Sequence, residues 1–175
     1  MNKKNTDTDN PNFDSRTYCK NPNSKKLGVF GSRSLSDERV FILIAEEVRK
    51  GFTHILTCQE PGGVSEVAQK VAKHYGYPLQ CHFLNMQYLR GAFEQRSKEV
   101  IVEADEFLVI HDGQSKGTAN ELKLVKKSGK PYRYEILEKS EFTKSVGFNI
   151  KEDWDTALDE LDQILHLDYE QTTKD

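Results

Sequence analysis

The residues with the strongest chemical signal lie in one stretch, Phe107 to Glu121, which reads FLVIHDGQSKGTANE. An apolar run ends there in a polar loop that contains Gly113 and Gly117, and a helix-like segment follows. A strand, a glycine-containing loop and a helix start direct backbone N–H groups and the positive end of a helix dipole at an anion. Because the chain uses this arrangement three times, the sequence predicts a site for a phosphate-bearing small molecule.

Two interpretations fit the loop that ends at Glu121. In the functional one, Ser115, Gly117 and Thr118 hold a phosphate, and Asp112 lies beside them. Glu121 then faces the ligand, where a carboxylate can hold a sugar hydroxyl or assist cleavage of a glycosidic bond. In the structural one, Thr118 and Glu121 form a capping box, because they are three residues apart. The sequence leaves both open.

The first of the two earlier loops is Gly31-Ser32-Arg33, which follows an apolar run. Gly31 allows a sharp turn and a close approach to a ligand because it has no Cβ. Ser32 offers a hydroxyl group, and Arg33 offers a fork of donors that suits phosphate. The alternative is an ordinary strand-to-helix turn with a surface arginine.

The second earlier loop is Pro61-Gly62-Gly63, which precedes a helical pattern. Its backbone N–H groups are candidates for cradling a phosphate. Glu66, in the first turn of that helix, either complements the helix dipole or accepts a hydrogen bond from a ribose hydroxyl.

Other titratable residues give weaker signals. Arg96, in the helix before the fourth predicted strand, either pairs with phosphate or with Glu121, or is one of several solvated charges in residues 94–99. His111, at a strand end beside the third loop, is a better candidate than the other histidines. Cys58 lies at another strand end, but no His or Asp is placed in the sequence to suggest a catalytic thiol. No metal-ligand spacing is visible, and the pattern points to no cofactor.

Alternating elements position these loops. Strands are predicted at residues 27–30, 54–57, 79–84, 106–110 and 131–137, and helices from about Ser36 and at residues 64–74, 88–104 and 117–128. This order predicts an α/β domain, Rossmann-like and three-layered, with a mostly parallel five-stranded sheet. The carboxyl ends of its strands form one edge, where ligands bind. Apolar residues at Trp154, Leu158, Leu161 and Leu165 predict a C-terminal amphipathic helix.

Composition limits the function classes. The chain has 175 residues, which suits one domain at residues 27–137, between a polar tail (1–26) and a connector, helix and short tail (138–175). A net charge of −3, with an acidic excess outside the tail, makes nucleic-acid binding unlikely. Three cysteines without CxxC spacing and the lack of an apolar span or signal region predict a cytoplasmic protein that does not enter membranes.

With these loops in view, the chain resembles the SLOG superfamily, which includes the Smf/DprA DNA-processing proteins and the Lonely Guy phosphoribohydrolases. The closest likeness is to its small YspA-like members. The resemblance rests on Gly31-Ser32-Arg33, on Pro61-Gly62-Gly63, and on Ala104-Asp105 followed by Asp112-Gly113-Gln114-Ser115-Lys116-Gly117-Thr118. It covers about Leu27 to Leu137. It implies a Rossmann-like fold, a nucleotide-derived ligand and a homo-oligomer.

Motif differences separate the activities within that superfamily. Gly117-Thr118-Ala119-Asn120-Glu121 is similar to the Gly-Thr-x-x-Glu element of Lonely Guy proteins, with Arg96 in place of the arginine that works with that glutamate. The Pro-Gly-Gly that precedes this element in Lonely Guy proteins is replaced here by Asp112-Gly113-Gln114. In the YspA-like pattern, an aspartate usually stands where this chain has Ser65-Glu66, and an Arg-Asn pair usually precedes Ala104-Asp105.

Three functions follow as expectations, in this order. The first is binding of a nucleotide or nucleotide-derived ligand, for sensing or processing. The second is hydrolysis of the N-glycosidic bond of a nucleoside monophosphate, with Glu121 and Arg96 as catalytic residues. The third, implied by the likeness to DprA, is binding of single-stranded DNA. The candidate ligand-binding residues are Gly31, Ser32, Arg33, Gly62, Gly63, Glu66, Asp112, Gly113, Ser115, Gly117 and Thr118.

Overall fold

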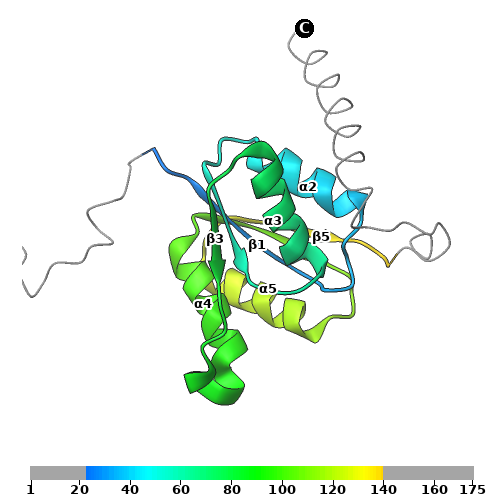
Figure 1. The fold of residues 1–175 in the computed structure, drawn as a ribbon. Coiled ribbons are helices and arrows are strands. Elements are labelled where there is room, and N and C mark those ends of the chain that lie inside the picture. Colours follow the sequence, from blue (N-terminus) through cyan, green and yellow to red (C-terminus); the bar gives the residue numbers. More distant parts are fainter. Residues whose placement is uncertain (1–22, 140–175) are drawn as a thin grey trace, which may run out of the picture.

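A five-stranded, all-parallel sheet forms the centre of the protein in the computed structural model, which describes residues 23–139 (Figure 1). Its strands are β1 (Lys26–Gly31), β2 (His54–Cys58), β3 (Leu79–His82), β4 (Glu106–His111) and β5 (Tyr132–Ile136). Their spatial order is β3-β2-β1-β4-β5. The predicted Rossmann-like α/β class is therefore confirmed, with a sheet that is parallel throughout.

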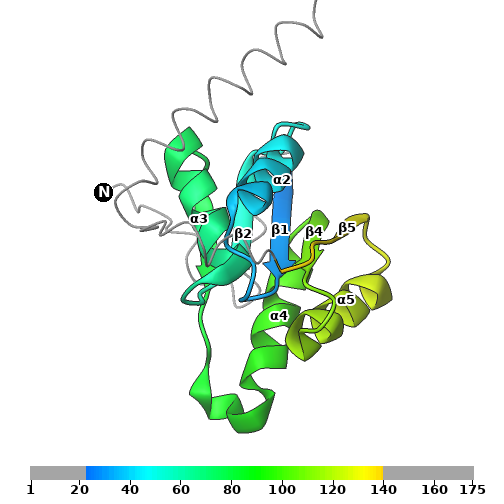
Figure 2. The same ribbon diagram turned by 90° about the vertical axis from the view of Figure 1, so that its right-hand side faces the viewer.

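Four α-helices within the described residues cover the two faces of this sheet (Figure 2). Helices α2 (Glu38–Val48) and α3 (Gly63–Tyr75) pack on one face, and α4 (Ala92–Glu103) and α5 (Lys116–Ser128) pack on the other. Successive side chains of a strand point to opposite faces. Accordingly, Leu108 and Ile110 of β4 join the core under α2 and α3, whereas Phe107 and Val109 join the core under α4 and α5.

The predicted helix at residues 88–104 is wrong in its first part. The chain forms a 3₁₀ segment, η2 (Met86–Gly91), and α4 begins only at Ala92. Leu89 interrupts any continuous helix because its φ of 48° and ψ of −120° are not helical. Residues 83–91, which run from the end of β3 to the end of η2, form an arm that extends away from the sheet (Figures 1 and 2). The predicted third strand, 79–84, is also shorter and ends at His82.

Residues 1–22 and 140–175 lie outside the described part of the chain. The predictions of a polar tail and of an amphipathic helix around Trp154 and Leu165 fall on them. Within residues 23–139, no helix combines the length and the apolar character needed to cross a bilayer.

Candidate functional site

The site lies where the chain changes direction in the sheet, between β1 and β4. The loop after β1 leads to α2 on one face, and the loop after β4 leads to α5 on the other. Gly31 pairs with Ile110 in the ladder, so both loops begin at the same level of the sheet edge. Such a switch point is where open parallel sheets bind ligands.

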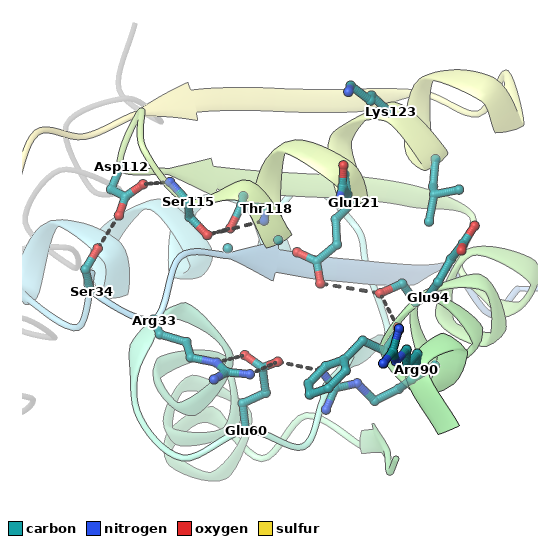
Figure 3. Close-up of a pocket in the computed structure, with 17 residues that line it drawn as sticks. Arg33, Ser34, Glu60, Arg90, Glu94, Asp112, Ser115, Thr118, Glu121 and Lys123 are labelled. Carbon is teal, nitrogen blue, oxygen red and sulfur yellow. Dashed lines mark hydrogen bonds and ion pairs between the residues drawn. The ribbon is translucent and has the colours of Figure 1, made fainter. Parts of the chain in front are cut away.

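A cavity of about 890 Å³ opens at this edge (Figure 3). Its wall is formed by the loops after β1, β2 and β4 and by the arm, α4 and α5. The structure brings together in this wall most of the residues that the sequence singled out: Gly31, Arg33, Arg96, Asp112, Ser115, Gly117, Thr118 and Glu121. The other candidates, Ser32, Gly62, Gly63, Glu66 and Gly113, are not among the lining residues of the described chain.

Buried hydroxyl groups fix the two loops to each other. Ser32, which is 1% exposed, accepts a hydrogen bond from the backbone N–H of Asp112 (3.0 Å). Its Oγ also shares a hydrogen bond with the hydroxyl of Thr118 (3.2 Å). In addition, the N–H of Ser32 donates to the carbonyl of Ile110 (3.0 Å). Ser32 therefore positions the cavity wall from behind.

The start of α5 overturns the capping-box interpretation of Thr118 and Glu121. The N-cap is Ser115, whose Oγ accepts from the N–H of Thr118 (3.3 Å), and Thr118 is already inside the helix. Within the described chain, the N–H groups of Lys116 and Gly117 make no hydrogen bond. Unbonded N–H groups at the N-terminus of a helix are donors for an anion.

Asp112 already supplies one negative charge at this helix start. Its carboxylate accepts from the N–H groups of Gln114 (2.9 Å) and Ser115 (2.7 Å) and from the hydroxyl of Ser34 (2.6 Å). Burial alone raises the pKa of Asp112, but these hydrogen bonds outweigh burial and hold the pKa well below its usual range. Asp112 is therefore ionised at neutral pH, and its main contacts order the loop.

Glu60, in the loop after β2, is a site residue that the sequence reasoning missed. Its carboxylate pairs with the guanidinium group of Arg33 (3.3 Å; Figure 3). The same carboxylate pairs with the guanidinium group of Arg96. The hydrogen bonds from Arg33 to Glu60 raise the pKa of Arg33 further above its ordinary value. Nothing in the spacing of residues 58–63 indicates this contact, because it depends on α4 crossing beside the loop after β2.

Arg96 is the most deeply buried charged residue of the cavity. Only 2% of it is exposed, and its Nη1 donates to the carbonyl of Gln59 (3.1 Å). Its buried Nε has no hydrogen-bond partner in the described chain. The interpretation of Arg96 as a solvated surface charge is therefore wrong. A buried N–H without an acceptor lowers the stability of the fold, so Arg96 brings both a positive charge and an unsatisfied donor to the cavity wall.

Glu121 lies on α5, one turn after Thr118. Its carboxyl group accepts a hydrogen bond from the hydroxyl of Ser97 on α4 (3.4 Å). Burial raises the pKa of Glu121 to about 8, and the nearby negative charge of Glu60 adds to this shift. Arg96 opposes the shift but does not cancel it. At neutral pH, Glu121 is therefore mostly a neutral acid that can donate a proton or a hydrogen bond.

The net charge of the cavity wall depends on Glu121. When Glu121 is protonated, positive side chains exceed negative ones, which favours an anionic ligand. Loss of its proton removes this excess. The positive side chains of the wall are Arg33, Arg90, Arg96 and Lys123, and the other acidic ones are Glu60, Glu94 and Asp112.

The loop with Gly62 and Gly63 serves the packing of α3 against the loop after β1. The N–H of Val64 donates to the carbonyl of Ser32 (3.3 Å) rather than facing the cavity. Gly63 has a φ of +70°, and a Cβ there would lie 2.7 Å from the Ser32 carbonyl oxygen. Glu66 pairs with Lys70 of the next helical turn (3.5 Å) and has no contact with the cavity wall.

Two other strand-end residues have structural surroundings. His111 contacts the carbonyl of Ser115 (3.0 Å) and the hydroxyl of Tyr134 (2.9 Å), which braces the loop after β4. Burial raises the pKa of the Cys58 thiol to about 12, so it is protonated at neutral pH and is not an activated nucleophile. Among residues 23–139, no group of three or more His, Cys, Asp or Glu side chains is placed to hold a metal ion.

Comparisons with known proteins assign the chain to no family. No protein-family model and no curated protein matches the chain.

Proposed function

We propose that residues 27–137 form a cytoplasmic, SLOG-like domain that binds a nucleotide or nucleotide-derived ligand in the cavity beside β1 and β4. The observation that supports this most directly is the combination of two unbonded N–H groups at the start of α5 with the buried guanidinium of Arg96. The N–H groups offer donors to an anion at the switch point of the sheet, and the guanidinium adds positive charge to the cavity wall. The cavity of about 890 Å³ is large enough for a nucleoside monophosphate.

The parts of such a ligand have distinct partners in this proposal. The N–H groups of Lys116 and Gly117 and the hydroxyl of Ser115 bind phosphate, and Arg33 adds a charged fork from the rim. Glu121, as a neutral acid, donates a hydrogen bond to a sugar hydroxyl. Gly117 leaves the space before the helix open, because a Cβ there would have only the Ser115 hydroxyl within 4 Å, at 3.9 Å.

Binding is tested by calorimetry with AMP, GMP, CMP and UMP at pH 6.5. We expect at least one of them to bind, and we expect Arg96→Gln to weaken that binding about tenfold or more. Glu46→Gln is a suitable control, because Glu46 is exposed on α2, on the opposite face of the sheet. If none of the four nucleotides binds at millimolar concentration, the proposed ligand class is wrong.

A second function, hydrolysis of the N-glycosidic bond, is favoured by the raised pKa of Glu121. A neutral carboxyl group can give its proton to the departing base while the bond from C1′ of the ribose to the base nitrogen breaks. Water then adds to C1′ and returns a proton to Glu121. The sequence predicted that a carboxylate at Glu121 assists cleavage of a glycosidic bond, whereas here Glu121 acts as a neutral proton donor.

The two functions are separated by incubating the protein with each nucleoside monophosphate and following free base by chromatography. Base release that is lost in Glu121→Gln, while nucleotide binding and the circular dichroism spectrum persist, supports the hydrolase. Binding without base release over many hours supports a sensor or processing factor instead.

A further inference from the structure

One residue of the cavity wall has an aromatic side chain, which phosphate binding does not use. Phe93, in the first turn of α4, lines the cavity and is 51% exposed. The guanidinium of Arg96 lies over its ring, 5.5 Å from the ring centroid. Apart from Leu124, the other lining residues are charged, polar or glycine, so a large apolar ring is left partly open to a mostly polar cavity.

The backbone holds this ring at a defined place. Ala92, the residue before Phe93, is 1% exposed and anchors the first turn of α4 in the core. The carbonyl of Phe93 accepts from the hydroxyl of Ser97 (3.1 Å), and the same hydroxyl contacts Glu121 (3.4 Å). The fixed backbone and the contact with Arg96 restrict the ring before a ligand stacks on it, which lowers the entropic cost of stacking.

These contacts also place the groups that would bind a ligand in a definite order. On α5, Glu121 follows the N-terminus of the helix by about one turn. Ser97 joins Glu121 to α4, and Phe93 lies one turn further toward the start of α4. A ligand with an anionic group, a hydroxylated ring and a planar ring in this sequence matches the order of partners. A nucleoside 5′-monophosphate has its phosphate, ribose and base in that order.

We propose that Phe93 is the stacking platform for the base of the bound nucleotide, a subsite that rests on the proposed function. A planar heteroaromatic ring gains stacking and buries the open part of the phenyl ring. Arg96 strengthens the platform, because the cation covers the ring on one side and leaves the exposed remainder for the base. Stacking tolerates every base, so Phe93 gives affinity for a base rather than a choice among bases.

The test compares two ligands that differ only in the base. Calorimetry measures the tightest binder among AMP, GMP, CMP and UMP, and ribose 5-phosphate, with wild type, Phe93→Ala and Phe93→Trp. We expect wild type to bind the nucleotide about tenfold or more tightly than ribose 5-phosphate. Phe93→Ala should lose most of this preference while its affinity for ribose 5-phosphate stays within about twofold, and Phe93→Trp should keep the preference.

Phe83→Ala provides the matched control, because Phe83 is 67% exposed on the arm and is not among the lining residues. An equal loss of affinity for both ligands in Phe93→Ala would overturn the inference, since the ring would then contact the sugar or support the whole site. Equal binding of both ligands by wild type would also overturn it, while the proposed function would stand. Failure of wild type to bind either ligand would overturn both proposals.

Discussion

The carboxylate of Glu60, in the loop after β2, forms an ion pair with the guanidinium of Arg96, which α4 buries beneath the cavity. The same carboxylate pairs with Arg33, whose side chain is mostly exposed on the rim. Glu60 is thus shared between a fixed cation and a movable one. An anionic ligand that attracts Arg33 leaves the pair with Arg96 in place.

Removing the charge of Glu60 is expected to destabilise the fold. Glu60→Gln leaves the buried Arg96 without its counter-ion, and breaking a buried pair on one side should lower the free energy of unfolding by about 3 kcal/mol. Urea denaturation measures this loss. Glu66→Gln removes a carboxylate from an exposed pair with Lys70 and should cost less than about 0.5 kcal/mol. Equal losses in the two variants would mean that Arg96 does not depend on Glu60.

The pH dependence of stability should report on Glu121. Burial first, and Glu60 second, raise the pKa of Glu121 to about 8 in the folded protein, against about 4.5 in the unfolded chain. Between these values the folded state binds a proton that the unfolded state has released. The free energy of unfolding therefore falls as the pH rises from about 4.5 to 8, and the contribution is constant above that window.

Glu121→Gln removes this titration. The variant should match wild type near pH 4.5 and exceed its stability at pH 8, with a difference on the order of 4 kcal/mol. Chemical denaturation of both proteins at pH 5, 6.5 and 8 measures the difference. A constant offset at all three values would show that Glu121 keeps an ordinary pKa in the fold.

Cysteine reactivity gives a chemical test of the burial of Cys58. The pKa of about 12 for the buried Cys58 leaves about one thiolate in ten thousand at pH 8. Cys81, on β3, is only partly buried. Iodoacetamide at pH 8, followed by peptide mass spectrometry, should label Cys81 at least about tenfold faster than Cys58. The two rates should converge in urea, and faster labelling of Cys58 in the native protein would contradict its burial.

Sequence reasoning predicted the elements where local signals are strong. Continuous apolar runs located β1 and β4, because strands buried on both faces of a parallel sheet need them. The predicted helices at residues 64–74 and 117–128 lie close to the observed α3 and α5, which end at Gly76 and Gly129 in the left-handed conformation. The common edge of the loops after β1 and β4 followed from the α/β pattern alone.

The parts that were missed depend on contacts between distant segments. Glu60 and Phe93 carry no motif, and they reach the cavity only because α4 crosses the loop after β2. The backbone of Leu89, which breaks the predicted long helix, has no local signal except the nearby Gly91. Gly62 and Gly63 carried a glycine-rich signal, but neither residue lines the cavity, and Gly63 packs closely against the backbone of Ser32 and Arg33.

Gly63 and Gly76 offer a direct test of that packing role. Both have almost the same φ, +70° and +72°, so alanine brings a similar backbone strain at either position. At Gly76 a Cβ would meet nothing within 4 Å, whereas at Gly63 it would clash with the backbone of Ser32 and Arg33.

Gly76→Ala should therefore cost about 1 kcal/mol, and Gly63→Ala should cost about 3 kcal/mol or more in urea denaturation. The excess measures the contact between α3 and the loop after β1, because the conformational penalty is common to both variants. Similar losses would show that this loop moves aside without cost. In that case the hydrogen bonds from Ser32 to the loop after β4 could not fix the positions of the loops after β1 and β4 relative to each other.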